Sequence, residues 1–429
     1  MKIHNHLLPF FICLSFEVMC QVPEPAKDQD HPIAVTGATI HTGTGSVLEN
    51  ATLKFESGKI TYVGIERGDL DGFEEIDASG KHVYPGFILP NTLLGLVDIN
   101  AVRPTRDYQE VGDFKPHIRS LVAYNTDSEV IPTFRFNGIL LAQSTPRGGA
   151  ISGTSSIMML EGWNWEDAVF KEDDGIHLNW PSLSFGPRWW LGETERRPNK
   201  RYGEQVLAIK QFFTDLKGYV KGNGPTTNLL MEASTGLLSG EKILHLHADH
   251  AKAIVEAITF FKENDIPKIV LVGGRDAWRV VDLLKSHDIP VILGDVHERP
   301  FRDDEDIDLA YKMPSMLADA GIKVALGYEN LQSSRNLPFF AGTASTYGLD
   351  KEDALKMITS NTAEILGIAD RAGSLAVGKD AIFFISEGDA LDMRTSKLTH
   401  AFIQGKEIDL KGKQQLLYER FKRKYQESE

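Results

Sequence analysis

Cysteine is nearly absent from this chain of 429 residues. Its two cysteines, Cys13 and Cys20, both lie within the first 20 residues. The remainder therefore has no disulfide framework and no thiolate for nucleophilic catalysis or metal binding. We infer that the folded state depends on a hydrophobic core, for which the chain length and the 42% hydrophobic composition are sufficient.

The chain also lacks a surplus of positive charge and several familiar catalytic motifs. Sixty acidic residues outnumber 46 Lys and Arg, and the formal net charge is −14. This charge disfavours a nucleic-acid or anionic-membrane surface, and solubility is enough to explain it. No Gly-x-Ser-x-Gly element supports a serine hydrolase. The Gly-rich residues 147–153 lack the lysine and spacing of a phosphate loop, so they predict a turn beside a strand.

No hydrophobic run is long enough to span a bilayer. The apolar run Leu7–Phe16 follows Lys2 and precedes the sequence Val18-Met19-Cys20. Residues 1–20 are therefore predicted to be a signal peptide, which would place the protein in a periplasm or outside the cell. Lipidation at Cys20 is the alternative, and the bulky Met19 disfavours it.

The segment Ile243–Glu329 alternates short apolar strands with amphipathic helices. Within it, Ile254, Ala257, Ile258 and Phe261 recur at helical spacing and predict one apolar helix face. Such alternation is typical of a parallel sheet covered by helices, so we expect an α/β fold with a (β/α)8 TIM barrel. The predicted barrel strands are Phe87–Leu89, Ile139–Ala142, Ile157–Leu160, Ile243–His247, Ile269–Val272, Val291–Leu293 and Val324–Leu326.

A second, smaller unit is predicted from the two ends of the chain. Ala51–Glu56 and Lys59–Gly64 alternate apolar and polar residues around a two-residue turn, which is a hairpin signal. Similar strands recur only near the far end, at Ala381–Ile385 and within His400–Ile408. The expected organisation is a signal peptide (1–20), a linker (21–30), a small β-sandwich domain from residues 31–83 and 371–410, a barrel (84–370) and a charged C-terminal helix (411–429).

Six motifs accompany the predicted split β domain and barrel. They are Gly80-Lys81-His82-Val83-Tyr84-Pro85-Gly86-Phe87-Ile88, His245-Leu246-His247, Ala325-Leu326-Gly327-Tyr328-Glu329, Arg335-Asn336-Leu337-Pro338, Thr362-Ala363-Glu364-Ile365-Leu366-Gly367 and Gly373-Ser374-Leu375-Ala376-Val377-Gly378-Lys379-Asp380. Together they resemble the amidohydrolase superfamily, and more narrowly its imidazolonepropionase-like and prolidase-like branch. The likeness covers about residues 32–410.

The resemblance implies chemistry at the carboxyl ends of the barrel strands. In this superfamily imidazoles and carboxylates hold a divalent metal that activates water, and an eighth-strand carboxylate transfers the proton. Here Asn91 and Leu93 stand where the first-strand imidazoles belong, and Gly273 replaces the sixth-strand histidine. The fifth-strand position, His245, is intact, and Glu329 takes the place of the eighth-strand aspartate.

The candidate site residues follow from these positions. Glu329 is the candidate proton shuttle, and His245 and His247, which share one strand face, are the candidate metal ligands. Asp295 and His297 are either substitute ligands or polar residues of the barrel rim. The candidates for binding a substrate carboxylate are Arg335 and Arg275, because both follow strand ends.

Two functions of different class stay open at this point. One is hydrolysis of an amide C–N bond, in a dipeptide or a non-peptide substrate, with a reduced site holding one divalent metal (zinc, iron or manganese). The other is a catalytically silent relative that holds no metal and either binds a small ligand or pairs with an active amidohydrolase. The expected partner is a small molecule, with no nucleic acid and no membrane span, and a homo-oligomer is the further alternative.

Overall fold

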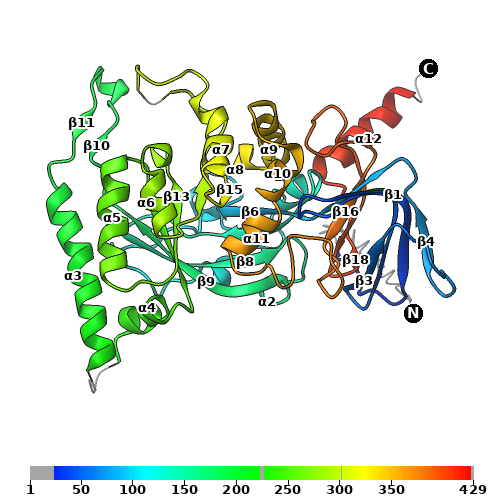
Figure 1. The fold of residues 1–429 in the computed structure, drawn as a ribbon, viewed down its shortest axis with the longest axis horizontal. Coiled ribbons are helices and arrows are strands. Elements are labelled where there is room, and N and C mark those ends of the chain that lie inside the picture. Colours follow the sequence, from blue (N-terminus) through cyan, green and yellow to red (C-terminus); the bar gives the residue numbers. More distant parts are fainter. Residues whose placement is uncertain (1–23, 223–226, 301, 427–429) are drawn as a thin grey trace, which may run out of the picture.

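The structure, a computed structural model, describes residues 24–222, 227–300 and 302–426. The predicted signal peptide lies outside these residues, and residues 24–30 of the predicted linker have no regular secondary structure. A large mixed sheet with its helices occupies one end of the molecule, and a small sheet occupies the other (Figure 1). In the described part of the chain, no helix combines the length and the apolar character needed to cross a membrane.

The large sheet is an eight-stranded, nearly closed barrel. Its strands follow the chain in order from β6 to β15, and β15 returns to lie beside β6. All eight are largely buried, so they supply the core of the molecule. The strands are β6 Phe87–Thr92, β7 Ile139–Ser144, β8 Ile151–Met159, β9 Val169–Asn179, β12 Ile243–Ala248, β13 Ile269–Gly273, β14 Val291–Leu293 and β15 Val324–Leu326.

One strand of the barrel runs against the others. β8 pairs antiparallel with both β7 and β9, whereas every other neighbouring pair in this sheet is parallel. The predicted strand Ile157–Leu160 is the far end of β8, and the expected uniformly parallel barrel is corrected here. The cause is the short connection 145–150, since a parallel neighbour needs a crossover of a dozen or more residues.

Helices cover the outside of the barrel sheet (Figure 1). The predicted apolar face of α5 is confirmed, because Ile254, Ala257, Ile258 and Phe261 are all fully buried. The helices are α1 Ile131–Arg135, α2 Trp165–Ala168, α3 Tyr202–Lys221, α4 Leu229–Ser239, α5 Ala251–Glu263, α6 Val281–Ser286, α7 Leu309–Asp319, α8 Leu331–Ser334, α9 Leu337–Thr346, α10 Lys351–Lys356, α11 Ser360–Ile365 and α12 Lys413–Gln426.

The small sheet draws its strands from both ends of the chain, as expected. β5 joins the halves by pairing with β1 on one side and β16 on the other. Its core contains Phe55, Phe383 and Phe402, whose ring centroids lie 4.8 to 5.2 Å apart. The strands are β1 Ile33–His41, β2 Val47–Glu56, β3 Lys59–Gly64, β4 Glu74–Asp77, β5 His82–Pro85, β16 Phe383–Ser386, β17 Leu398–Ile403 and β18 Lys406–Glu407.

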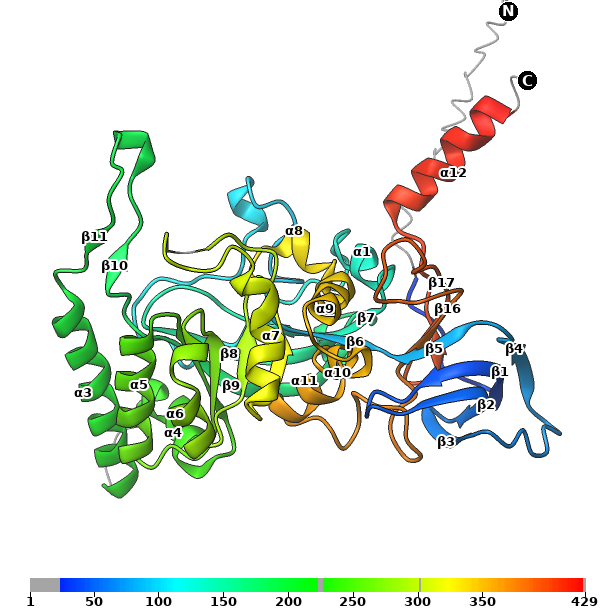
Figure 2. The same cartoon turned by 45° about the horizontal axis from the view of Figure 1, so that its top comes forward.

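Two segments project from this body (Figure 2). One is an arm between β9 and α3, built on the short strands β10 (Ser184–Phe185) and β11 (Arg197–Pro198). The other is the charged helix α12, which buries none of its residues. The base of the arm reaches the barrel mouth, where Ser182 and Arg196 line the cavity described next.

Candidate functional site

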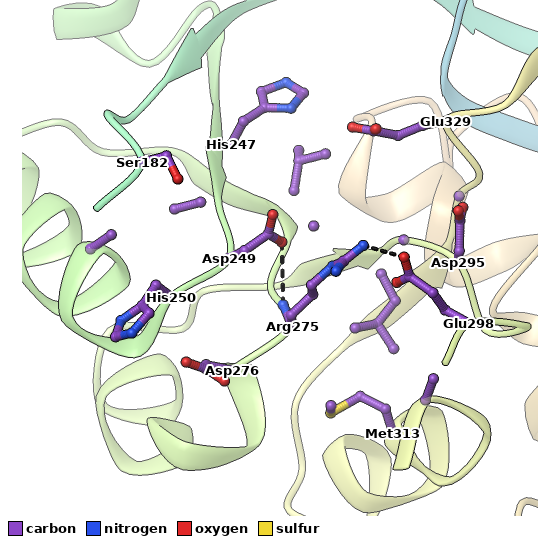
Figure 3. Close-up of a pocket in the computed structure, with 18 of the residues that line it drawn as sticks. Ser182, His247, Asp249, His250, Arg275, Asp276, Asp295, Glu298, Met313 and Glu329 are labelled. Carbon is purple, nitrogen blue, oxygen red and sulfur yellow. Dashed lines mark hydrogen bonds and ion pairs between the residues drawn. The ribbon is translucent and has the colours of Figure 1, made fainter. Parts of the chain in front are cut away.

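A cavity of about 420 Å³ opens at the carboxyl ends of the barrel strands (Figure 3). This is the face at which (β/α)8 barrels carry their chemistry. Residues at the ends of five strands contribute to the wall: Asn91 on β6, His247 on β12, Gly273 on β13, Asp295 after β14 and Glu329 after β15.

Carboxyl groups dominate one side of the cavity. Burial and the neighbouring Glu298 raise the pKa of Asp295 to about 6. The backbone N–H of Glu329 lies against this carboxyl, while Asp295 Oδ1 is buried without a hydrogen-bond partner. Arg275 forms an ion pair with Glu298, and its backbone N–H donates to Asp249 Oδ1 at 3.4 Å (Figure 3). Asp295 and Glu329 are therefore the carboxyls available for proton transfer or ligand contact.

A guanidinium group is hydrogen-bonded to Asn91 near the end of the first barrel strand. Arg147 donates from Nη1 to Asn91 Oδ1 at 2.7 Å and from Nη2 to Asn91 O at 2.9 Å. Burial lowers the pKa of Arg147 to about 10, and the Glu329 carboxylate opposes this shift. The group is thus a cation at neutral pH, fixed beside Asn91 and near Glu329. Asn91 itself has a left-handed backbone (φ 53°), a conformation that asparagine tolerates better than most residues.

Behind the cavity, polar side chains from four strands form a buried network. His247 Nε2 lies 2.8 Å from His177 Nδ1, and His177 Nε2 lies 2.9 Å from Ser155 Oγ. Ser155 Oγ donates to Asp174 Oδ1 at 2.8 Å, and Gln143 Nε2 donates to Asp174 Oδ2 at 2.7 Å. The network connects the cavity wall at His247 to a carboxylate that is 1% exposed.

His245 belongs to this network rather than to the cavity wall. It is fully buried, and its ring stacks on His177 with centroids 4.4 Å apart. Its Nε2 lies 3.0 Å from Gln143 Nε2, and its Nδ1 has no partner. Gly175 on β9 makes room for the ring, since a Cβ at this position would lie 2.5 Å from His245 Cδ2.

The described residues do not fit the metal centre of the superfamily. Among them, no group of three or more His, Cys, Asp or Glu side chains is arranged to hold a metal ion. His247 has one ring nitrogen free of the network and His177 has none. Gly273 has φ 91°, and a Cβ there would lie 2.6 Å from Asp249 Oδ1, so a histidine cannot take its place. A catalytic zinc needs three protein ligands.

The structure brings only some of the sequence candidates together. Glu329, His247 and Arg275 line the cavity, and His245 lies behind it. Arg335 is exposed and is not part of the cavity wall, so its position does not favour the expected contact with a bound carboxylate.

The two candidates that follow β14, Asp295 and His297, also differ in position. Asp295 lines the cavity. His297 is exposed outside it and lies 2.7 Å from the Thr343 hydroxyl, as expected of a polar rim residue.

Five residues of the site were not among the sequence candidates. They come from strands with little apolar alternation or from a turn, so no local motif marks them. Both ring nitrogens of His177 have hydrogen-bond partners. The five are Arg147, Gln143, Ser155, Asp174 and His177.

Comparisons with known proteins agree with this fold. A family model described as the amidohydrolase family matches residues 182–408. The chain is similar to the crystal structure of an amidohydrolase from Thermotoga maritima MSB8, with a TM-score of 0.78 and 25% identity over 88% of this chain and 99% of that one. No sequence among curated proteins matches.

Two more distant structures share the fold. One is a prolidase complexed with N-methylphosphonate-L-proline (TM-score 0.54, 15% identity, 88% of this chain and 99% of that one). The other is a Xaa-Pro dipeptidase with bound methionine (TM-score 0.55, 12% identity, 88% of this chain and 100% of that one). Because the family model spans more than half of the sequence, the chain belongs to the amidohydrolase family.

Proposed function

We propose that this protein is a catalytically silent member of the amidohydrolase family that binds a small polar ligand in the barrel-mouth cavity. The observation that carries this proposal concerns the strand ends where the family resemblance implies metal ligands. At these positions the expected side chain is either replaced or hydrogen-bonded to another group of the protein. Asn91 is hydrogen-bonded by Arg147, Gly273 has no side chain, and His245 is fully buried with its Nε2 against Gln143.

The built-in cation supports this proposal on electrostatic grounds. Arg147 places a fixed positive charge among Asn91, His247 and Glu329, and a divalent ion in the same space would be repelled. The cavity nevertheless keeps a size and a mix of polar and apolar lining suited to a small molecule. Retention of the cavity without the metal ligands favours binding over hydrolysis.

A second candidate is hydrolysis of an amide C–N bond, in a dipeptide or a non-peptide substrate, with a reduced metal site. The observation in its favour is the pair Asp295 and Glu329, because a carboxyl with a pKa of about 6 is suited to proton transfer near neutral pH. The prolidase and dipeptidase likenesses suggest Xaa-Pro dipeptides as substrates to test. If the protein is a hydrolase of this kind, we propose that it belongs to the prolidase-like and imidazolonepropionase-like branch of the family.

The two candidates are separated by activity and by ligand-dependent stability. The purified protein is assayed on a panel of Xaa-Pro dipeptides and cyclic amides with added zinc, iron or manganese, beside the variant Glu329→Gln. The proposal predicts no metal-dependent turnover in either protein, and a rise in melting temperature with a cavity ligand that chelator does not remove. Turnover that requires metal and is abolished by Glu329→Gln would establish the hydrolase instead.

We further propose that the protein is exported to a periplasm or secreted, through cleavage after residue 20. The support is the apolar, weakly basic N-terminal segment that precedes Val18-Met19-Cys20. N-terminal sequencing of the protein from its native host tests this, with Gln21 as the expected first residue. A first residue of Met1 would contradict it, and a lipid-modified Cys20 would show the anchored alternative.

We also propose that the chain associates with a second protein chain. The chain either forms a homo-oligomer or pairs with a related, active amidohydrolase. Mass measurement by light scattering, alone and after co-purification from the host, distinguishes these from a monomer.

A further inference from the structure

The buried network behind the cavity determines which nitrogen of each histidine carries a proton. The starting point is Ser155, which has one hydroxyl proton and donates it to the Asp174 carboxylate at 2.8 Å. Gln143 donates to the other oxygen of the same carboxylate, and its orientation is fixed because its Oε1 accepts from the Asn91 backbone N–H at 3.0 Å. Asp174 therefore acts purely as an acceptor in the network.

The proton positions of the two histidines follow from this donor. Since the Ser155 proton is committed to Asp174, His177 Nε2 must donate to Ser155 Oγ across their 2.9 Å contact. Among the described residues, the ring nitrogens of His177 contact His247 and Ser155, and those of His247 contact His177, so neither ring has a carboxylate partner and each carries one proton. His177 Nδ1 is then an acceptor, and His247 Nε2 donates to it at 2.8 Å.

His247 is left with an unprotonated Nδ1. This atom is the one polar group of the ring that the network does not use, and the side chain lines the cavity (Figure 3). On the other side of the cavity, Asp295 Oδ1 and the Glu329 carboxylate also offer acceptors. A ligand group that carries lone pairs but no proton would meet repulsion at His247.

Resting on the proposed ligand-binding function, we propose that His247 is the specificity-determining residue of the cavity. The chain His247–His177–Ser155–Asp174 holds it as a hydrogen-bond acceptor through Nδ1, and the ligand presents an N–H or O–H donor to it. The ligand class is thus a small amide, amine or alcohol with a free proton at the contact. Discrimination of this kind is strong because a mismatched ligand leaves a buried polar group unpaired.

Nitrogen-15 NMR of the histidine-labelled full chain at neutral pH tests the proton positions directly. The expected result is a His247 spectrum with a protonated Nε2 and a bare Nδ1, before any ligand is added. The resonances are identified by their loss in His247→Gln. A proton on Nδ1 would overturn the proposal, and this outcome is independent of whether the protein hydrolyses amides.

The donor requirement is tested with two probes that differ in one feature. Acetamide carries N–H protons, whereas N,N-dimethylacetamide has the same acceptor and none. Acetamide is expected to shift the His247 Nδ1 resonance and dimethylacetamide to leave it unchanged. Equal perturbation by both probes, or none by acetamide, would contradict the proposal.

A matched pair of variants separates the cavity contact from the network. His247→Asn places an oxygen near the Nδ1 position and keeps an acceptor, whereas His247→Gln keeps the donor to His177 and removes that acceptor. Acetamide binding, followed by ligand-observed NMR, is expected to survive in His247→Asn and to be lost in His247→Gln. The opposite order would show that the residue acts through the network alone.

Discussion

Changing one buried oxygen of Asp174 to an amide nitrogen should invert the hydrogen-bonding character of the cavity wall at His247. In Asp174→Asn the amide oxygen is expected to keep the bond from Gln143, whose orientation is fixed. The amide nitrogen then faces Ser155 Oγ and donates to it. Ser155 is released to donate to His177 Nε2, which at 2.9 Å is nearer than its other acceptor, the Gly175 carbonyl at 3.3 Å, and the His177 proton moves to Nδ1. His247 must then carry its proton on Nδ1.

The energetic cost of this substitution can be worked from the same contacts. Asp174 is 1% exposed and accepts hydrogen bonds of 2.7 Å from Gln143 and 2.8 Å from Ser155, and His245 Nε2 lies 3.4 Å from its Oδ2. Bonds to a charged group contribute about 1.5–3 kcal/mol each and neutral bonds about 0.5–1.5 kcal/mol. Converting both bonds from charged to neutral therefore lowers the free energy of unfolding by about 2–3 kcal/mol, which leaves a protein of ordinary stability folded.

The control for this prediction is the adjacent acidic residue. Asp173 pairs with Arg119 at 2.9 Å, is outside the network, and has φ 49°, which asparagine tolerates. Asp173→Asn is expected to leave the His247 resonances unchanged and the melting temperature nearly so. Nitrogen-15 NMR and thermal unfolding are measured on both variants. A folded Asp174→Asn protein in which His247 still carries its proton on Nε2 would refute the reasoning.

Three further predictions concern the surroundings of the site. Arg135→Met should lower the free energy of unfolding by about 3–5 kcal/mol, because it leaves Glu161 buried without its ion-pair partner. Thermal unfolding measures this loss, and a loss below about 1 kcal/mol would contradict the prediction. Asp295→Asn should raise the free energy of unfolding at pH 7 by about 1 kcal/mol and leave it unchanged below pH 4. The reason is that a carboxyl with a raised pKa binds more protons in the folded state, so it lowers the stability of the protein as the pH rises from 4 to 6. Urea titrations at both pH values test the sign of this effect. Gly175→Ala should cost about 1–3 kcal/mol and displace the His245 ring, which NMR of the histidine resonances would detect; an unchanged spectrum would show that the contact is not tight.

The sequence predicts those parts of the fold in which the local pattern of apolar and polar residues matches the burial of the same residues in the structure. The apolar runs Val291–Leu293 and Val324–Leu326 become β14 and β15 with the same bounds, and the hairpin at residues 51–64 becomes β2 and β3. Each is either fully buried or exposed on one face, so its hydrophobic period reports its position.

The strand β9 shows why other parts could not be predicted. Its middle carries Lys171, Glu172, Asp173 and Asp174 in succession, which reads as a turn rather than as a strand. Yet β9 pairs antiparallel with β8, and Asp174 is satisfied by groups from other strands. The stabilising contacts are distant in sequence, so no local pattern contains them.

The residues of the site also differ in whether the sequence could predict them. The ends of predicted strands correctly brought attention to His247 and Glu329, because the carboxyl ends of barrel strands meet at one face. The proton-directing residues Ser155 and Asp174 were not predicted because their role depends on which residues of neighbouring strands lie opposite each other, and the reversed β8 changes that register. The position of Arg147 depends on the turn before β8, for which the sequence gives no side-chain direction.

The metal content of the purified mature protein, measured by elemental analysis after dialysis, tests the central claim most directly. We expect less than a tenth of an equivalent of zinc, iron or manganese per chain, on the order of what nonspecific binding leaves. We also expect no increase when the protein is dialysed against each metal and then against buffer. About one equivalent of any of these metals, retained through dialysis, would contradict it, since His247, Glu329 and their neighbours would then hold an ion in place of the hydrogen bonds described.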